Sequence, residues 1–386
     1  MQNKRFEIWV YILVILFSAL FIYFGNKKMT SEKMYMAEGA STNSVVAIVE
    51  SIVDIKTESI QSSGQYSFNT KDILFEAKIQ NGQRKGEIVS GLQNINAYMM
   101  VVPKEIEVGD KVILFEISTA SYGTDWVYGE YVRSDALMGL AIVFAVLLII
   151  FGRSKGVKTL VSLLFTIMAI FYVFVPAVLA GKNIYLWAII ICVYTIVMTL
   201  ILVSGLERKT LAASIGCFSG LAVSGFLVWF MDLFLGLTGI VNEESVYLIM
   251  MNPEQPLNLK AIVFAAILIG AMGAIMDVAM SIASSLNEIA MHSEKPRFSE
   301  LVKSGMTIGR DIMGTMANTL ILAYIGGSLT LVLLLITYTS GWIDLLNREM
   351  VVIEVLQSLV GSMGILFTLP LTTFVSAFLY THHKTK

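Results

Sequence analysis

Two stretches of the chain place polar side chains within membrane-length apolar sequence: GAMGAIMDVAMSIASSLNEI at residues 270–289 and GRDIMGTMANTLILAYIGGSL at residues 309–329. About 20 consecutive apolar residues are enough to cross the hydrocarbon core of a bilayer as a helix. An acidic side chain in or beside such a segment is costly, so it needs a partner or a function. The two stretches therefore predict a polytopic α-helical membrane protein with a polar centre.

The composition agrees with this class. Hydrophobic residues make up 56% of the 386 residues and charged residues only 15%, whereas soluble proteins have roughly 45–50% and about 25%. Both cysteines, Cys192 and Cys217, lie in apolar segments, where they are expected to be small buried hydrophobes. We therefore expect no disulfide framework, no metal site and no cofactor.

Hydropathy predicts eight membrane-spanning helices. The first, at residues 8–24, follows Lys4 and Arg5 and lacks a small-residue cleavage site, so we expect an uncleaved anchor. Pro176 and Pro370 predict bends in the third and the last span. The other seven spans are expected near residues 136–151, 160–180, 184–203, 211–236, 261–283, 318–338 and 351–380.

These spans divide the chain into three expected parts. An anchor helix occupies residues 1–25, and a polar segment occupies residues 26–133. A seven-helix membrane domain follows at residues 134–386, with a cytoplasmic loop near residues 290–310.

Lysine and arginine residues orient the spans. With the N-terminus in the cytoplasm, the short cytoplasmic flanks hold 13 Lys and Arg residues, and the short outer flanks hold only Lys182, Lys260 and Arg348. Basic flanks favour the cytoplasm. An even number of spans returns the C-terminus to the cytoplasm and leaves the polar segment outside.

The polar segment has the alternation of β-strands. Residues 73–79 alternate with a period of two, and the hairpin signal Asn81-Gly82 follows them. Further strands are expected at residues 98–102, 111–115 and 126–132, which predicts a small barrel or sandwich. An oligonucleotide-binding-type barrel is one topology that fits. The mixed charge forms no basic track, so we expect no nucleic acid as a partner.

Each of the two opening stretches carries a polar stripe along one helix face, because its polar residues follow steps of four and three. Antiparallel neighbouring helices would bring the stripes together at a similar depth. We expect Arg310 to neutralise Asp277 or Asp311, and the other groups to line a cavity. The candidate site residues are Asp277, Ser281, Ser284, Glu288, Arg310, Asp311, Thr315 and Asn318.

A structural role is the alternative for these residues. Asp311 and Arg310 can form an interfacial ion pair, and Ser or Thr in membrane helices often bond to the backbone one turn back. The spacing of Gly216 and Gly220, and a line of Gly and Thr at residues 361–372, predict closely packed helices. The alternative for these small residues is a flexible or broken helix near a substrate site.

The same polar stretches resemble the YibE/F-like family of bacterial membrane proteins. The matching residues are MDVAMSI at residues 276–282, Glu288 after it, and the whole of residues 309–329. The resemblance extends over residues 136–386. It implies a multi-pass protein of the bacterial plasma membrane, and it carries over no catalytic or binding residue.

These features favour a secondary transporter or permease of a small solute or ion. Acids on neighbouring helices and glycine-interrupted spans suit a moving pathway, and no GxxxxGK[ST] sequence indicates ATP binding. The alternative is an envelope assembly or scaffold protein whose β-domain binds a partner. An intramembrane aspartyl enzyme using Asp277 and Asp311 is disfavoured, because their flanks lack the Gly-x-Gly-Asp setting. Lipid, the solute, and a second copy or a related membrane subunit are the expected partners.

Overall fold

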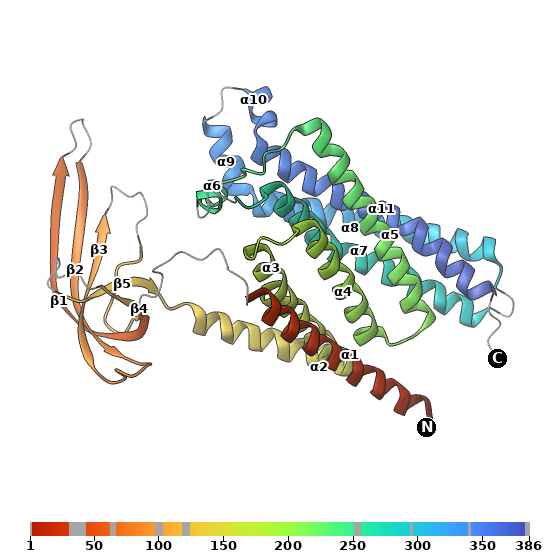
Figure 1. Ribbon diagram of the computed structural model, residues 1–386, viewed down its shortest axis with the longest axis horizontal. Coiled ribbons are helices and arrows are strands. Elements are labelled where there is room, and N and C mark those ends of the chain that lie inside the picture. The colour runs from red at the N-terminus through yellow and green to blue at the C-terminus, as the bar shows by residue number, and fades with distance from the viewer. Residues whose placement is uncertain are drawn as a thin grey trace. The chain divides into compact units, whose positions relative to one another are not determined.

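The computed structural model describes residues 2–30, 44–61, 67–96, 103–117, 124–250, 256–293, 296–338 and 341–382 (Figure 1). The strand expected at residues 98–102 lies outside these ranges. The chain forms two compact units, Met1–Met36 with Leu148–Lys386, and Ala37–Leu147. All strands of the described residues belong to the second unit.

The second unit contains a closed five-stranded barrel with the strand order β1-β2-β3-β5-β4. Among the strands of the described residues, only β3 and β5 pair in parallel. Because the sheet closes on itself, it is a small barrel and not a sandwich, and five-stranded barrels include the oligonucleotide-binding-type domains. The strands are β1 (Ser44–Gln61), β2 (Ser67–Ile79), β3 (Ile88–Asn96), β4 (Lys111–Glu116) and β5 (Trp126–Tyr131).

Strand β1 is long enough to pair with two neighbours. Ala47 lies opposite Ile79 of β2 and Val112 of β4. Two register irregularities in β1, at Val49/Ser51 and Ile52/Asp54, interrupt its ladder with β2. Bulges of this kind bend a strand and increase its twist, which allows the sheet to close.

The barrel core follows the predicted alternation. Ile73, Phe75, Ala77 and Ile79 are all buried, which confirms the period of two in β2. Gly91 of β3 is required by this packing, because a Cβ at that position would collide with the ring of Phe75.

The helical part of the chain is built from long apolar helices. Among the described residues, six helices are long and apolar enough to cross a membrane, and the pair α8 and α9, bent by 60°, would be a seventh. The helices are α1 (Gln2–Thr30), α2 (Ser134–Ala169), η3 (Ile170–Phe174), α3 (Val175–Leu179), α4 (Ile184–Ser204), α5 (Arg208–Leu235), α6 (Glu243–Met250), α7 (Leu259–His292), α8 (Phe298–Gly327), α9 (Leu329–Tyr338), α10 (Trp342–Asn347) and α11 (Glu349–His382).

Helix α2 is two helical segments joined by a sharp turn. Arg153 has non-helical backbone angles, with φ of 47° and ψ of −128°. A Cβ on Gly156 would collide with the carbonyl group of Leu148, although eight residues of straight helix would separate the two positions by about 12 Å. The turn therefore lies between the apolar runs at residues 136–151 and 160–180.

The loop expected near residues 290–310 is much shorter in the structure. Helix α7 continues to His292 and α8 begins at Phe298. The polar start of α8 is helical because one of its faces is apolar and packed: Leu301 and Gly305 are buried. A Cβ on Gly305 would touch Leu286 of α7 and Thr373 of α11.

The small residues of α5 and α11 form a close helix contact. Gly216 and Gly220 lie against Thr372 and Thr368, so closely that a Cβ on either glycine would collide with the threonine hydroxyl. Contacts of this type bring membrane helices together through dispersion forces. The prediction of closely packed helices at these positions is confirmed.

Pro176 lies beside a local widening of the helix. The five residues before Val175 form the π-helix η3, and Pro176 follows in α3. A proline has no N–H, so the carbonyl of Tyr172, four residues earlier, lacks the donor of a regular α-helix. Asn26 of α1 donates its side-chain N–H to this carbonyl at 2.9 Å. Pro370, by contrast, lies inside the continuous helix α11.

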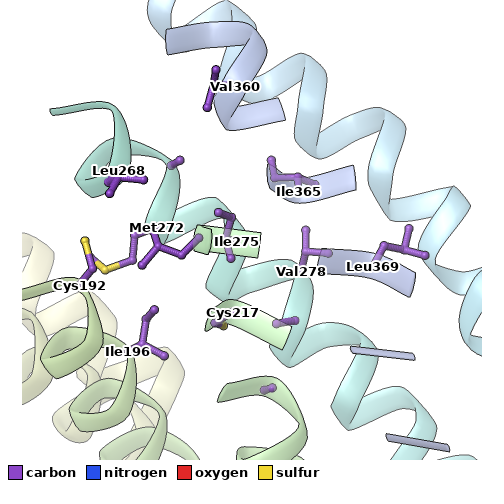
Figure 2. Packing of buried hydrophobic residues seen from close by; sticks show 14 of the residues in the cluster. Cys192, Ile196, Cys217, Leu268, Met272, Ile275, Val278, Val360, Ile365 and Leu369 are labelled. Carbon is purple, nitrogen blue, oxygen red and sulfur yellow. The ribbon is translucent and has the colours of Figure 1, made fainter. Parts of the chain in front are cut away.

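Helix α4 has two buried faces that separate two groups of helices. One face, with Tyr194 and Met198, packs in a cluster with residues of α1, α2 and η3. The other face, with Cys192 and Ile196, joins the cluster formed by α5, α7, α8 and α11 (Figure 2). The contact between α4 and α7, here called the α4–α7 seam, is therefore the junction of the two groups.

Candidate functional site

A polar pocket of about 630 Å³ lies at one end of the α4–α7 seam. Its walls come from the first turns of α1, the turn of α2, the connection from α4 to α5, and one face of α7. We call it the lysine pocket, because Lys155, Lys158 and Lys209 line it. All of these residues belong to the helical unit.

Lys158 is held in the pocket wall by Tyr11 of α1. Its Nζ donates a hydrogen bond to the Tyr11 hydroxyl at 2.8 Å and lies 3.9 Å from the centre of the ring. A cation over an aromatic face is attracted by the ring quadrupole. This contact holds the Lys158 ammonium group against α1. The same contact joins α1 to α2.

The connection from α4 to α5 depends on Gly205. This residue has a φ of +76°, which a side chain rarely allows. The hydroxyl of Thr210 donates to its carbonyl at 2.7 Å. The resulting tight turn places Glu207 and Lys209 on the pocket, where their side chains form an ion pair at 2.7 Å.

Hydroxyl groups line the side of the pocket formed by α4 and α7. Ser204 donates to the sulfur of Met280 at 3.6 Å, which joins the end of α4 to the second half of α7. Ser284, one turn further along α7, also lines the pocket. The site therefore combines three ammonium groups, one carboxylate and two serine hydroxyls.

Only Ser284 of the predicted site residues lies in this pocket. On α7, Ser281 is half-buried, and Asp277 and Glu288 are exposed. The buried face of α7 is a different one, with Ile275, Val278 and Ile282 fully buried. The stripe of α7 thus reaches the pocket at one residue and otherwise lies on the surface of the unit.

The stripe of α8 is exposed throughout, at Arg310, Asp311, Thr315 and Asn318. The expected ion pair of Arg310 with Asp277 or Asp311 does not occur among the ion pairs of the described residues. The two stripes do not share a buried chamber in this part of the chain.

Helix packing explains why the stripe of α8 is exposed. Helix α8 turns its glycine face inward, and a Cβ on Gly309 would collide with Leu369 of α11. Thr315 instead donates to the carbonyl of Ile312 at 2.9 Å. Such local bonding is what the structural alternative predicts for this hydroxyl.

A second pocket of about 370 Å³ lies at the other end of the α4–α7 seam. Asn183 and Asn258 line it, and each caps the helix that follows by accepting a backbone N–H at 3.1 Å. We call it the asparagine pocket. It includes the first residues of α4 and α7, whereas the lysine pocket includes the last residue of α4 and the second half of α7.

Apolar side chains close the seam between the two pockets. Cys192 and Ile196 of α4 pack with Leu268 and Met272 of α7, and all four are buried (Figure 2). Nearer the asparagine pocket, Ala188 and Ala265 belong to a second buried cluster on the same seam. The seam is therefore a closed barrier with a polar recess at each end.

Comparison with known proteins identifies the family of the chain. A family model described as YibE/F-like protein matches residues 140–382. The chain belongs to the YibE/F-like family. No curated protein and no solved structure matches it. In this YibE/F-like protein, the matched region contains all three pocket lysines and the whole α4–α7 seam, whereas Tyr11 and the barrel precede it.

The sequence provided a weak signal for the lysine pocket of this YibE/F-like protein. Lys155, Lys158 and Lys209 were evident as basic residues in short flanks, and such residues are already explained by membrane orientation. Their convergence depends on the turn of α2 and on the contact of α1 with α4. Neither follows from local periodicity.

Proposed function

We propose that this YibE/F-like protein is a secondary transporter that moves a small anionic solute along the α4–α7 seam. The observation that carries the proposal is the pair of polar pockets at the two ends of one buried helix contact. Alternating access requires a recess on each side and a closed contact between the two recesses. Three lysines at one end favour an anion.

Rocking of two helix groups would open the barrier to one side at a time. One group contains α1, η3 and α4, and the other contains α5, α7, α8 and α11. The second group is joined tightly by the glycine contact of α5 with α11, so it can move as one body. Alternating access of many transporters is a largely rigid movement of this kind.

We further propose eight spans, with the barrel outside and both termini in the cytoplasm of a bacterial cell. The turn at Arg153 supports counting α2 as two spans, and the bent pair of α8 and α9 supports one more. Single cysteines at Thr70 and Lys303 test the orientation. We expect an impermeant thiol reagent to label intact cells only at position 70; labelling of both from outside contradicts the topology.

The exposed stripes on α7 and α8 support a membrane partner. Asp277 on α7 and Asn318 on α8 are exposed, and polar groups of this kind are costly against hydrocarbon. A second copy or a related membrane subunit would cover them. We expect the protein to run as a dimer or larger in mild detergent, and a monodisperse monomer would argue against this partner.

Flux through proteoliposomes tests the transport proposal. The probes are inorganic phosphate, sulfate, acetate and chloride, each applied as a concentration jump while the current is recorded. We expect a current with at least one anion, and its loss when Ser204→Leu and Ser284→Leu fill the lysine pocket. Ser219→Leu, at a half-buried position of α5 outside the pocket, is the matched control. Currents equal to those of empty liposomes for every probe would contradict the proposal.

A scaffold role in the cell envelope is the second candidate function. The observation in its favour is a run of exposed apolar side chains on β1 of the barrel, at Ile52, Val53 and Ile55. Such a run indicates a surface that another molecule covers. A photo-reactive residue at position 53 that captures one envelope protein in cells, together with absent flux, would favour this role.

A further inference from the structure

We infer that the lysine pocket binds a doubly charged phosphate group, supplied by inorganic phosphate, by a soluble phosphate ester or by a monoester lipid headgroup. This inference rests on the proposed function, because it names the solute that the lysine pocket would bind at one end of the α4–α7 seam. The argument uses the charge of the pocket, its donors and its volume.

The charge of the lining residues matches a dianion. Lys155, Lys158 and Lys209 carry three positive charges, and Glu207 carries one negative charge, which leaves a net charge of +2. A phosphate monoester carries about −1.5 to −2 at pH 7. A single carboxylate would leave one ammonium group without a counter-charge, so the pocket selects the doubly charged group.

The lysines keep donors available for a ligand. An ammonium group has three N–H donors. Lys158 uses one on the Tyr11 hydroxyl and Lys209 uses one on Glu207, so each retains others. Lysine binds phosphate as a point charge at flexible distance. Ser204 and Ser284 add hydroxyl donors from the opposite wall.

Helix α5 begins at the pocket and adds to its positive potential. The helix has 28 residues, and the residue before it, Glu207, makes no side-chain cap. The first N–H groups of a helix have no partner within the helix and carry partial positive charge. Glu207 and Lys209, on either side of the first residue of α5, both line the pocket, so these N–H groups lie at its edge.

The volume leaves room for more than the phosphate group. A pocket of about 630 Å³ is in the range that holds drug-sized molecules. An organic group attached to the phosphate could extend toward Val10 and Val203, which form part of the apolar wall. This favours a monoester over the bare ion as the tighter ligand.

Direct binding to the full-length protein tests the inference. The protein is placed in phosphatidylcholine nanodiscs at pH 7.5, and binding of radiolabelled inorganic phosphate is measured. We expect saturable binding that is reduced at least tenfold by Lys155→Gln and by Lys209→Gln, and preserved by Lys155→Arg. Lys303→Gln, at an exposed position of α8 outside the pocket, should bind like wild type.

Competition separates the charge and the source of the ligand. Glycerol 3-phosphate should displace the label, and acetate at the same concentration should not. In nanodiscs containing phosphatidic acid, loss of label binding to wild type indicates that a lipid monoester occupies the site; unchanged label binding indicates a soluble phosphate. Both outcomes support a doubly charged phosphate group.

Three results would overturn the inference: no saturable binding of phosphate or glycerol 3-phosphate, with no phosphatidic acid retained; equal displacement by acetate; or binding unchanged in the lysine variants. Lys158→Gln is used only with a check of folding, because Lys158 also joins α2 to α1. Binding without flux would leave this inference intact and remove the transport proposal. Flux without phosphate binding would leave the transport proposal intact and overturn this inference.

Discussion

Single residues set the distance between helices α5 and α11. Gly220 lies against the hydroxyl of Thr368 and near the carbonyl of Gly364. We expect Gly220→Val to lower the free energy of unfolding by about 1–3 kcal/mol, the usual cost of overpacking a tight interior. Thermal unfolding in detergent measures it. Gly273→Val is the control, because nothing lies within 4 Å of a Cβ at that position; equal losses in both variants would contradict the packing argument.

One ion pair of the barrel predicts a pH dependence. Lys104 donates to the carboxylate of Asp110 at 3.0 Å, and this hydrogen bond raises the pKa of Lys104 above its ordinary value of 10.5. The folded state holds this proton more strongly than the unfolded state, so the pair stabilises the barrel below pH 10.5, and that stabilisation is lost as the pH rises through the raised pKa.

The variant Lys104→Met checks this sign. We expect the unfolding temperature of the barrel transition to be lower than that of wild type at pH 8, and the two to converge as the pH is raised beyond 10.5. Lys85→Met, at an exposed position in a turn, should follow wild type throughout. A constant gap between Lys104→Met and wild type at every pH would show that the charge of Lys104 is not responsible.

At this scale, sequence reasoning succeeded where a residue acts through its neighbours along the chain. The close-packing glycines and the alternating core of β2 follow from local spacing. The sequence did not place Lys158 in a site, because the partner that holds this side chain, Tyr11, is 147 residues away. It also expected Arg310 to pair with an acid, whereas packing through Gly305 and Gly309 leaves the stripe of α8 on the outside.

At the scale of elements, one hydrogen bond fastens α1 to the π-helix η3. The Asn26 side chain donates to the Tyr172 carbonyl at 2.9 Å, a group that Pro176 cannot serve. We expect Asn26→Leu to cost about 1–2 kcal/mol, because a carbonyl without a partner is unfavourable in a membrane. The measurement is thermal unfolding, combined with the rate at which protease releases α1.

Thr30→Val is the matched control for this variant. Among the described residues, the hydroxyl of Thr30 bonds only within α1, to the carbonyl of Asn26 at 2.8 Å, so its loss should have a smaller effect and leave the protease rate unchanged. If Thr30→Val loosens α1 as much as Asn26→Leu does, the hydrogen bond to Tyr172 is not what holds the helix.

Most elements could be predicted, and the differences lie at their ends. Apolar runs gave the long helices, because burial in lipid requires little beyond length and hydropathy. The polar first turns of α8 were expected to be a loop, since their helical structure depends on contact with Leu286 and Thr373 of other helices. The closure of the barrel could not be predicted from local patterns either, because it depends on β5 pairing with β3 as well as with β4.

At the scale of the whole molecule, the α4–α7 seam should control transport. Cys192 of α4 lies in the same buried cluster as Met272 of α7 (Figure 2). In a Cys217→Ala background, we expect oxidation of Met272→Cys to cross-link the seam to Cys192 and to stop the anion current. Reduction should restore the current. The test requires a current in the unoxidised variant.

A control for the cross-link uses the other side of α4. Ile189 is exposed, so Ile189→Cys combined with Met272→Cys and Cys192→Ala should not form the bond, and the current should be insensitive to oxidant. A current that persists after complete cross-linking of Cys192 would show that the seam does not open during transport.

The junction between barrel and helix within the second unit has a mechanical consequence. Only two residues separate β5, which ends at Tyr131, from α2, which begins at Ser134. The N–H of Val132 donates to the carbonyl of Lys111 at 2.8 Å, and the Lys111 side chain is paired with Asp135 at 2.7 Å. The first turn of α2 is thus fastened to β4 of the barrel, so a load on the barrel is passed to this turn instead of being absorbed by slack chain.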